Sequence, residues 1–363
     1  MSIVNPTMYF RYISKVYFKN FIFILMGLSL TFSIIDFFQN LISLETTLSN
    51  KILYIFYIWQ EALKLLYPLA IVFALILTKI YLVKNSNMSA LYALGYNNKA
   101  LILPFIGIAM GIYLVFAYLS TTEFAYAKEK ATSIIKNKMY DYNVDDIFFK
   151  YQDTFVYMQR LYPVEKTIEN VTIFKVKDKK VLYTIHAPYA IYNGTSWEAK
   201  DATLKTHNYV DGKLHSYSKE HKDSIVTLKG YKPKIIRSIY EGESLSTLDA
   251  YNTYKLLNKE HINTDKIKAT LYASLVVPLF AIALIIILFF KMPYLSRMSN
   301  QGLVIASSLG VTFVVWGIFY GLIQISSSSS ISSEVALLIP IALLWIYALY
   351  LYFFDEKKIQ TTF

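Results

Sequence analysis

The sequence predicts an α-helical membrane protein with six transmembrane helices, three on each side of an inserted all-β domain outside the cytoplasm. The composition is strongly apolar. Of 363 residues, 55% are hydrophobic and 17% are charged, whereas about 25% of the residues of soluble domains are charged. The charge is also uneven, since residues 120–264 hold 22 of the 36 Lys and Arg, 18 of the 25 Asp and Glu, and all five His. A single globular core is therefore excluded.

Six apolar segments are long enough to cross a bilayer, which takes about 20 residues of helix. They are 21–44, 67–83, 100–119, 269–290, 303–325 and 335–354. The second segment can begin earlier, because 52–59 is also apolar. Cleavage of the first as a signal peptide is not expected, because it is too long and lacks a small-x-small pattern. We therefore expect the domains 1–119, 120–264 and 265–363.

Lys and Arg near the ends of the spans predict the orientation. The N-terminal segment, the second-to-third loop, the fourth-to-fifth loop and the C-terminal tail are basic. Their basic residues are Arg11, Lys15, Lys19, Lys84, Lys99, Lys291, Arg297, Lys357 and Lys358. The loops 44–66 and 326–334 have no basic excess. We therefore expect both termini in the cytoplasm and the middle domain outside.

The middle region is predicted to be β structure bracketed by helices. Segments rich in β-branched and aromatic residues alternate with turn signals. The segments are 154–158, 171–176, 181–186 and 225–228, and the turns are 192–194, 210–212 and 228–230. Short strands at this spacing predict an antiparallel sandwich or an open barrel. We expect helices at 121–138, as a continuation of the third span, and at 246–260, where Ser246 and Asp249 have capping-box spacing.

The motifs of common catalytic and metal sites are missing from the sequence. There is no Cys, which excludes disulfides, thiol nucleophiles and Cys-ligated metals. No P-loop, HExxH or GxSxG motif occurs, so we expect the chain to hold no nucleotide phosphates by itself. We interpret four histidines as strand-face surface residues: His186, His207, His215 and His221. The acidic residues at 141–146 and 241–243 are interpreted as solvated faces.

Ionisable residues inside apolar segments are functional candidates, because they are costly there. Asp36 lies within the first span, and an interfacial position near the outer headgroups is the alternative. Glu61 and Lys64 are three residues apart and predict a pair on the helix surface. Two GxxxG patterns, which allow close helix approach, occur at 107–111 and 317–321.

The most informative short segment lies between the second and third spans. Met88, Leu91, Tyr92 and Leu94 form the apolar face of a short helix, and Gly95 is its stop signal. Such a helix either lies on the membrane surface or docks into a groove of a partner.

Several loose motifs occur in a fixed order over nearly the whole chain. They are Arg11-Tyr12, Tyr67-Pro68-Leu69-Ala70, Ser89-Ala90-Leu91-x-Ala93-x-Gly95 before Pro104, Asp153-x-Phe155-Val156-Tyr157-Met158-x-Arg160, Val171-x-Ile173-Phe174, Ala187-x-x-Ala190-x-Tyr192 before Trp197, Lys268 with Pro278-Leu279, and Pro340 with Trp345. With the three-plus-three plan, these motifs make the chain resemble the lipopolysaccharide-export permeases, the LptF/LptG (YjgP/YjgQ) family. The phrase Ile34-Ile35-Asp36-Phe37-Phe38 favours LptG over LptF.

The resemblance implies a non-catalytic permease subunit of an ABC transporter in the inner membrane of a Gram-negative bacterium. The implied partners are an LptB-like ATPase dimer, a second six-span permease (LptF or LptG), an LptC-like periplasmic protein and lipopolysaccharide, with no nucleic acid. ATP and magnesium would be held by the ATPase, and this chain would carry no cofactor. The β-domain is implied to be jellyroll-like, passing glycolipid to a periplasmic bridge.

The resemblance also assigns roles to residues. The segment 86–95 would be the ATPase-coupling helix, through Asn87, Met88, Ala90, Leu91, Tyr92, Leu94 and Gly95. Family members usually carry Glu at the position of Asn87, so we expect docking by shape and apolar contact. The lipid path or gate would include Asp36, Phe37, Lys128, Lys130, Gly317 and Gly321. LptG-like sequences can carry a basic residue at the position of Asp36, so Lys128 and Lys130 are the substitutes for contacting phosphates.

Two other functions fit the sequence less well. A mechanotransmission subunit of the FtsX/MacB type is also driven by an ATPase, but usually has four spans in a one-plus-three plan. A membrane-anchored sensor or enzyme would use the outer domain, which shows no convergent polar site.

Overall fold

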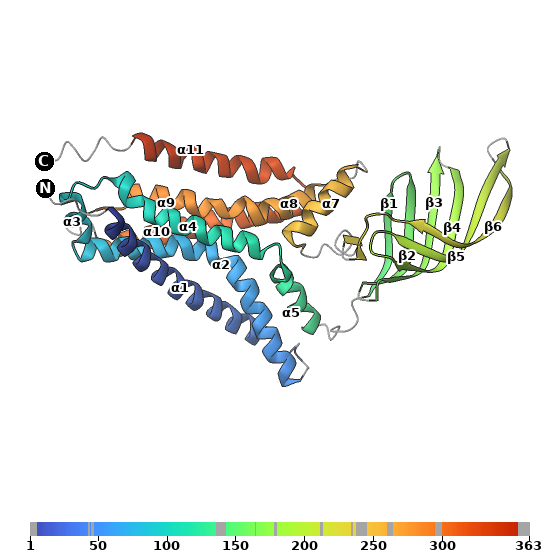
Figure 1. Cartoon of the computed structure of the whole chain (residues 1–363), viewed down its shortest axis with the longest axis horizontal. Coiled ribbons are helices and arrows are strands. Elements are labelled where there is room, and N and C mark those ends of the chain that lie inside the picture. Colours follow the sequence, from blue (N-terminus) through green and yellow to red (C-terminus); the bar gives the residue numbers. More distant parts are fainter. Residues whose placement is uncertain are drawn as a thin grey trace. The chain divides into compact units, whose positions relative to one another are not determined.

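The computed structural model describes residues 6–42, 44, 47–135, 143–163, 165–177, 180–210, 213–233, 235–236, 245–259, 264–294 and 300–354. In this part of the chain, six helices are long and apolar enough to cross a membrane, and the six strands of an antiparallel sheet follow the third and precede the fourth in chain order (Figure 1). The predicted fold class is thereby confirmed. Two compact units result. The helical unit is Met1–Ala131, Ser246–Tyr251 and Thr264–Phe363, and the strand unit is Thr132–Leu245 and Asn252–Asn263.

The spans before the sheet are α1 (Pro6–Gln39), α2 (Leu48–Lys84) and α4 (Asn98–Leu119). At 1.5 Å per residue, α1 and α2 are about 51 and 55 Å long, well beyond the ~30 Å hydrocarbon layer. The sequence-based bounds were too short for both. Helix α1 already begins in the basic lead-in, and α2 includes the apolar segment 52–59 in one continuous helix.

The fourth span consists of α8 (Asp265–Leu275), the short η2 (Val277–Leu279) and α9 (Phe280–Lys291). Proline has no amide hydrogen, so Pro278 interrupts the helical ladder there. The fifth span is α10 (Gln301–Ser327), capped by the side chain of Asn300. The sixth is one π-helical segment, η4 (Glu334–Leu338), followed by α11 (Ile339–Phe354).

The second and fourth spans lie at the centre of the helical unit. In their most apolar windows, 78% of α2 and 67% of the fourth span are buried, against 22% of α1 and 17% of α10. Helices α1 and α11 pack against this centre, α1 on α2 and α11 on α9. The start of α1 and the end of α11 lie at the same end of the unit (Figure 1).

Between α4 and the sheet the chain turns before it forms η1 (Glu123–Tyr126) and α5 (Ala127–Ile135). The prediction that 121–138 continues the third span is therefore wrong over its described residues. The reason is local, because the Thr122 hydroxyl accepts a hydrogen bond from the Phe124 amide and starts a new helix. After the sheet, α7 (Thr247–Lys259) is capped by Ser246, as the spacing to Asp249 predicts. The Ser246 hydroxyl accepts a hydrogen bond from the Asp249 amide and donates one to the Asp249 carboxylate, both at 3.1 Å.

The sheet contains β1 (Val144–Tyr151), β2 (Thr154–Tyr162), β3 (Thr167–Lys177), β4 (Lys180–Tyr192), β5 (Trp197–Val210) and β6 (Lys213–Thr227). Each strand pairs with the next in chain order. Over the described residues the strands therefore form one open sheet instead of the two sheets of a sandwich. The predicted turn at 192–194 joins β4 to β5, and Gly194 adopts φ +100° there. The predicted turn at 210–212 falls largely outside the described residues.

A transverse crease crosses the sheet. Asp146 on β1, Asn170 on β3 and Asp201 on β5 have left-handed φ values of 48 to 55°, which Asn and Asp tolerate better than most residues. At this line the alternation of inward and outward side chains slips by one residue. Each of the first five strands therefore buries two residues that are three positions apart in sequence. These pairs are Val144 and Ile147, Met158 and Leu161, Ile168 and Val171, Ala187 and Ala190, and Ala199 and Ala202. Strict alternation of faces therefore holds only within each half of a strand.

Candidate functional site

The loop between α2 and α4 folds as a seven-residue helix, α3 (Asn87–Ala93). Gly95 ends it with φ +87°, while the Gly95 amide donates to the Tyr92 carbonyl at 2.9 Å and the Tyr96 amide to the Leu91 carbonyl at 3.2 Å. This is the Schellman arrangement, in which a left-handed glycine satisfies the last carbonyls of a helix. The predicted stop at Gly95 is confirmed.

The two faces of α3 have different surroundings. Met88 is 1% exposed and belongs to the core of the helical unit, and Leu91 and Tyr92 pack partly buried against that core. Ala90, Leu94 and Gly95 are exposed, Leu94 by 58%. The residues that sequence analysis assigned to this segment therefore separate into an anchoring set and an outward apolar set.

Polar contacts also fix α3 to its neighbours. The Asn87 side chain donates to the Tyr12 hydroxyl of α1 at 3.1 Å. The Tyr92 hydroxyl donates to the Asn98 side chain, and its ring meets that of Tyr294 with centroids 5.6 Å apart. Burial, with the nearby Tyr294, raises the pKa of Tyr92 above its ordinary value, so its hydroxyl stays a donor. Helix α3 is therefore held to α1, to the start of α4 and to the segment after α9.

A buried lysine lies about two helical turns before α3. Lys79 of α2 is 2% exposed, and its Nζ donates to the carbonyls of Phe289 and, at 2.8 Å, of Met292. Its Nζ also lies 4.6 Å from the centroid of the Phe289 ring. These carbonyls belong to the C-terminal end of α9, where a positive charge is favourable. Lys79 thus joins the second span to the fourth.

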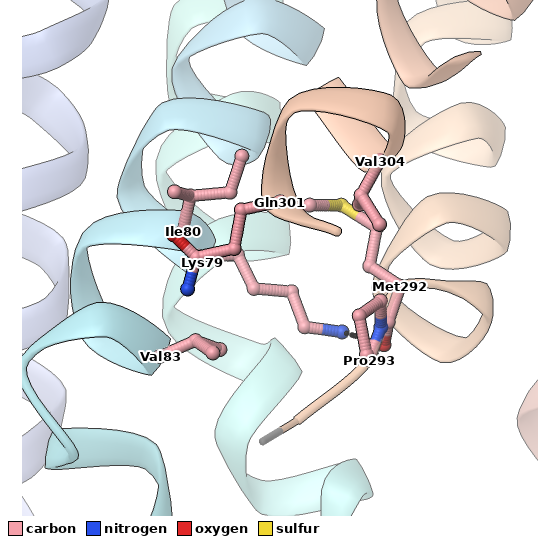
Figure 2. Close-up of a pocket in the computed structure, with 7 residues that line it drawn as sticks. All are labelled: Lys79, Ile80, Val83, Met292, Pro293, Gln301 and Val304. Atoms are coloured by element: carbon pink, nitrogen blue, oxygen red, sulfur yellow. Dashed lines mark hydrogen bonds between the residues drawn. The ribbon is translucent and has the colours of Figure 1, made fainter. Parts of the chain in front are cut away.

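Figure 2 shows that the Lys79 side chain extends from α2 toward Met292 inside a small pocket. The pocket is lined by Lys79, Ile80, Val83, Met292, Pro293, Gln301 and Val304. Sequence analysis missed this residue and treated 67–83 as an uninterrupted apolar span. A lysine inside this apolar segment was itself a signal of a buried contact, because an ionisable side chain inside a span faces protein or water far more often than lipid.

At the opposite end of the α1–α2 hairpin, Asp36 is engaged within the chain. Its carboxylate accepts a hydrogen bond from the Tyr54 hydroxyl and one from the Asn40 side chain at 3.3 Å. Tyr54 is 1% exposed. Phe37 follows half-buried, with its ring 5.8 Å from that of Phe38. Asp36 therefore fastens α1 to α2.

Helix α5 brings one of the two predicted lysines to this same end. Lys130 pairs with Glu123 at 3.1 Å and lies 5.7 Å from the ring centroid of Tyr57, one helical turn after Tyr54 on α2. Lys128 is exposed on α5. Asp36 and Lys130 thus contact tyrosines on adjacent turns of one helix.

The predicted pair of Glu61 and Lys64 does not form, since the described part of the chain holds no ion pair between them. Glu61 instead keeps one buried carboxylate oxygen that has no hydrogen-bond partner among the described residues.

Gly317 and Gly321 of α10 face open space within this chain. A methyl group built at Gly317 or Gly321 meets no atom within 4 Å, and the same is true at Gly111 of α4. At Gly107 it would reach the Phe10 ring at 3.7 Å, an ordinary contact. The predicted close approach at Gly317 and Gly321 is therefore not made to any described part of this chain, and this face of α10 is available to another subunit.

Polar bonds join the last three spans at the end opposite α3. Lys268 of α8 pairs with Glu334 at 2.7 Å. Ser333 donates to the Asp265 carbonyl at 2.6 Å and accepts from the Ser326 hydroxyl of α10 at 2.9 Å. The predicted loop 326–334 thus begins with a bond between α10 and the start of the sixth span.

The described residues contain no group of three or more His, Asp and Glu placed to hold a metal ion. A comparison with curated proteins returns no match. Residues 11–353 match the model of the family described as lipopolysaccharide export system permease LptF/LptG. This match covers all six spans and the sheet. The chain therefore belongs to the LptF/LptG family of lipopolysaccharide export permeases, which are the non-catalytic transmembrane subunits of an ABC transporter.

Proposed function

We propose that this permease takes lipopolysaccharide from the outer leaflet of the inner membrane, and that α3 is the element through which an LptB-like ATPase dimer drives it. The supporting observation is the division of α3 into two faces. One face anchors the helix through Met88 and Tyr92, while Ala90 and Leu94 present an uncharged surface. A short apolar helix face fits a hydrophobic groove.

Force applied to α3 would pass into the spans through rigid contacts. Met88 lies in the core of the helical unit, and Lys79 joins α2 to the end of α9. A displacement of α3 would therefore move the two central spans together. ATP and magnesium would be held by the ATPase.

The exposed helices α1 and α10 would line the lipid cavity with a second permease. Each acyl CH₂ moved into water costs about 0.8 kcal/mol, so the tails need a continuous apolar wall. The exposed aromatic and aliphatic residues of α10 and the open face at Gly317 and Gly321 supply one.

The finer assignments complete the proposal. Basic residues at the α3 end of the spans favour both termini and α3 in the cytoplasm and the sheet in the periplasm. There the sheet, in a jellyroll-like role, would pass lipid to an LptC-like protein. The segment Ile34–Phe38 favours the LptG position, opposite an LptF partner.

A carboxylate on the outward face of α3 tests the proposal. Leu94→Asp should remove most of the ATPase that co-purifies with the tagged permease pair, because a charge would be buried in the groove. Asn85→Asp is the matched control, since Asn85 is exposed outside the helix and gains the same charge. The ATPase bound per permease is measured by densitometry, and lipopolysaccharide release is measured in proteoliposomes.

Loss of ATPase binding and of release in Leu94→Asp, with both retained in Asn85→Asp, is the expected result. Normal binding in both variants would remove α3 as the docking element. A wild-type complex that hydrolyses ATP but releases no lipopolysaccharide would overturn the proposed function itself.

A further inference from the structure

Two rows of side chains cross the exposed side of the sheet beyond the crease. The first row is Phe148, Tyr157, Thr172, His186, Thr203 and His221, and the second is Lys150, Phe155, Phe174, Thr184, Lys205 and Lys219. Residues directly opposite in register lie on the same side of a sheet. We call these twelve residues the histidine–lysine face. It contains no Asp or Glu.

Hydrogen bonds confirm that these side chains share one surface. The Thr172 hydroxyl lies 3.1 Å from His186 Nδ1, and the Thr184 hydroxyl lies 3.3 Å from Nε2 of His207, which follows Lys205 by two residues on the same side of β5. Each bond orients an imidazole ring and leaves its other ring nitrogen for a further partner.

Lys205 and Lys219 are directly opposite each other on β5 and β6. Like charges in this position destabilise a sheet. Neither lysine forms an ion pair in the part of the chain that the structure describes, and the carboxylate of Glu220 lies on the other side of β6, where it pairs with Lys222. Asp146, at the crease, accepts its hydrogen bond from Tyr157 on the distant β2. The two lysines thus form a place where an anion would relieve repulsion.

The other end of the same face is aromatic. Phe148, Phe155 and Phe174 stack with centroids 5.8 to 5.9 Å apart, and Phe148 is 52% exposed. Flat aromatic surfaces pack well against the apolar C–H faces of sugar rings. The opposite side of the sheet is the buried apolar side, with Val156 and Met158 at 0% exposure.

We propose that the histidine–lysine face binds the phosphorylated saccharide headgroup of lipopolysaccharide. Phosphate would lie between Lys205 and Lys219, where charge-assisted hydrogen bonds are strong, with His186 and His221 as further donors. The sugar rings would extend toward the phenylalanines. This inference rests on the proposed function and assigns the headgroup to the polar side of the sheet.

Binding of a soluble headgroup tests the inference in the full chain. The probe is fully deacylated lipopolysaccharide, titrated by calorimetry onto the chain in phosphatidylcholine nanodiscs. Lys205→Gln/Lys219→Gln should weaken binding at least about tenfold, as expected for the loss of charge-assisted bonds. Lys175→Gln/Lys222→Gln removes the same charge from the other side of the sheet and should change it less than about twofold. Circular dichroism checks that both variants keep their strand content.

Equal weakening in the two variants, or none in either, would overturn the inference. Phosphatidylglycerol vesicles are the second probe: if Lys205→Gln/Lys219→Gln weakens vesicle binding but not saccharide binding, the face meets a membrane surface and the headgroup assignment is wrong. Release of intact lipopolysaccharide by the wild-type complex reports on the proposed function separately. A chain that binds the saccharide as predicted but releases no lipid would contradict the proposed function and leave the binding site supported.

Discussion

Helices α2 and α10 are almost equally apolar, with mean hydropathies of 2.1 and 2.0 over the most apolar stretch of each. Yet 78% of this stretch is buried in α2 and only 17% in α10. Hydropathy therefore locates the membrane but not the neighbours of a span. The reason is physical, because lipid tails are as apolar as leucine and do not drive spans together by the hydrophobic effect. The difference must come from other side chains.

Polar bonds distinguish the two helices. Helix α2 is linked to its neighbours by Tyr17 to the Ile71 carbonyl, by Asn20 to Thr78 and by Lys79 to Met292. Within α10, the hydroxyls of Ser307 and Thr312 instead bond to carbonyls of their own helix. The polar groups of α2 thus reach α1 and the end of α9, while these two hydroxyls of α10 are satisfied within their own helix.

The largest effect is expected from Lys79→Met, which should make α2 behave more like α10. Two hydrogen bonds from Lys79 Nζ are lost and the buried carbonyls at the end of α9 stay unpaired, so the free energy of unfolding should fall by about 3 kcal/mol. Unfolding in dodecyl sulfate mixed micelles, followed by circular dichroism, measures it.

The control for that variant is Lys84→Met, which removes an exposed lysine from the same helix and should change stability by less than about 0.5 kcal/mol. Equal effects at Lys79 and Lys84 would mean that the buried bonds carry no stability.

A smaller difference in stability between α2 and α10 is expected when a side chain in each helix is enlarged. Ala70→Leu in α2 adds atoms at a position with 0% exposure and should cost about 2 kcal/mol by overpacking. Gly317→Leu in α10 meets open space, so the single chain should keep its stability within about 0.5 kcal/mol. The same unfolding assay measures both.

Gly317→Leu should nevertheless reduce pairing with the second permease, measured by co-purification of two differently tagged subunits. Gly111→Leu, also open within the chain, is the control and should pair normally. A stable Gly317→Leu chain that pairs fully would show that this face of α10 touches lipid alone.

The smallest effect is expected at the end opposite α3. Glu334→Gln removes the ion pair with Lys268, whose side chains are 42% and 24% exposed, so the cost should stay below about 1 kcal/mol. A double-mutant cycle with Lys268→Met measures the pair itself. A coupling energy well above that bound would mark this contact as a main link between the fourth and sixth spans.

The spans and the β-domain were predictable because their signals are local. Apolar length located all six spans, and the last three have bounds within about four residues of the prediction. The helix cap at Ser246 and the stop at Gly95 depend on chain neighbours and were also correct. Strands β1 and β5 were not singled out, because VDDIFFKY and WEAKDATLKTHNYV mix charge with apolar residues and change phase at Asp146 and Asp201.

The site was less predictable because its contacts join distant parts of the chain. Lys79 donates to carbonyls 210 and 213 residues away. The residues next to Lys79 in the sequence do not indicate which carbonyls these are. Asp36 was singled out correctly as unusual, but its partner Tyr54 lies on the next helix. The face beyond the crease needed the strand register, since His186 and His221 were interpreted one by one as surface residues.

The crease in the sheet has a consequence for how freely the strands can vary in length. The crease divides each of the first five strands into a base and a tip, and the tips carry the histidine–lysine face. The alternation of inward and outward side chains in the tip is out of step with that in the base. Asp146, Asn170 and Asp201 mark the division on alternate strands. Two residues can be added to or removed from the tips of a hairpin without changing which side chains of the base point inward. One residue inserted into the base of a strand next to the crease would turn the inward side chains of that base outward. The length of the tips is thus adjustable in steps of two, while the inward-facing set of the base stays constant.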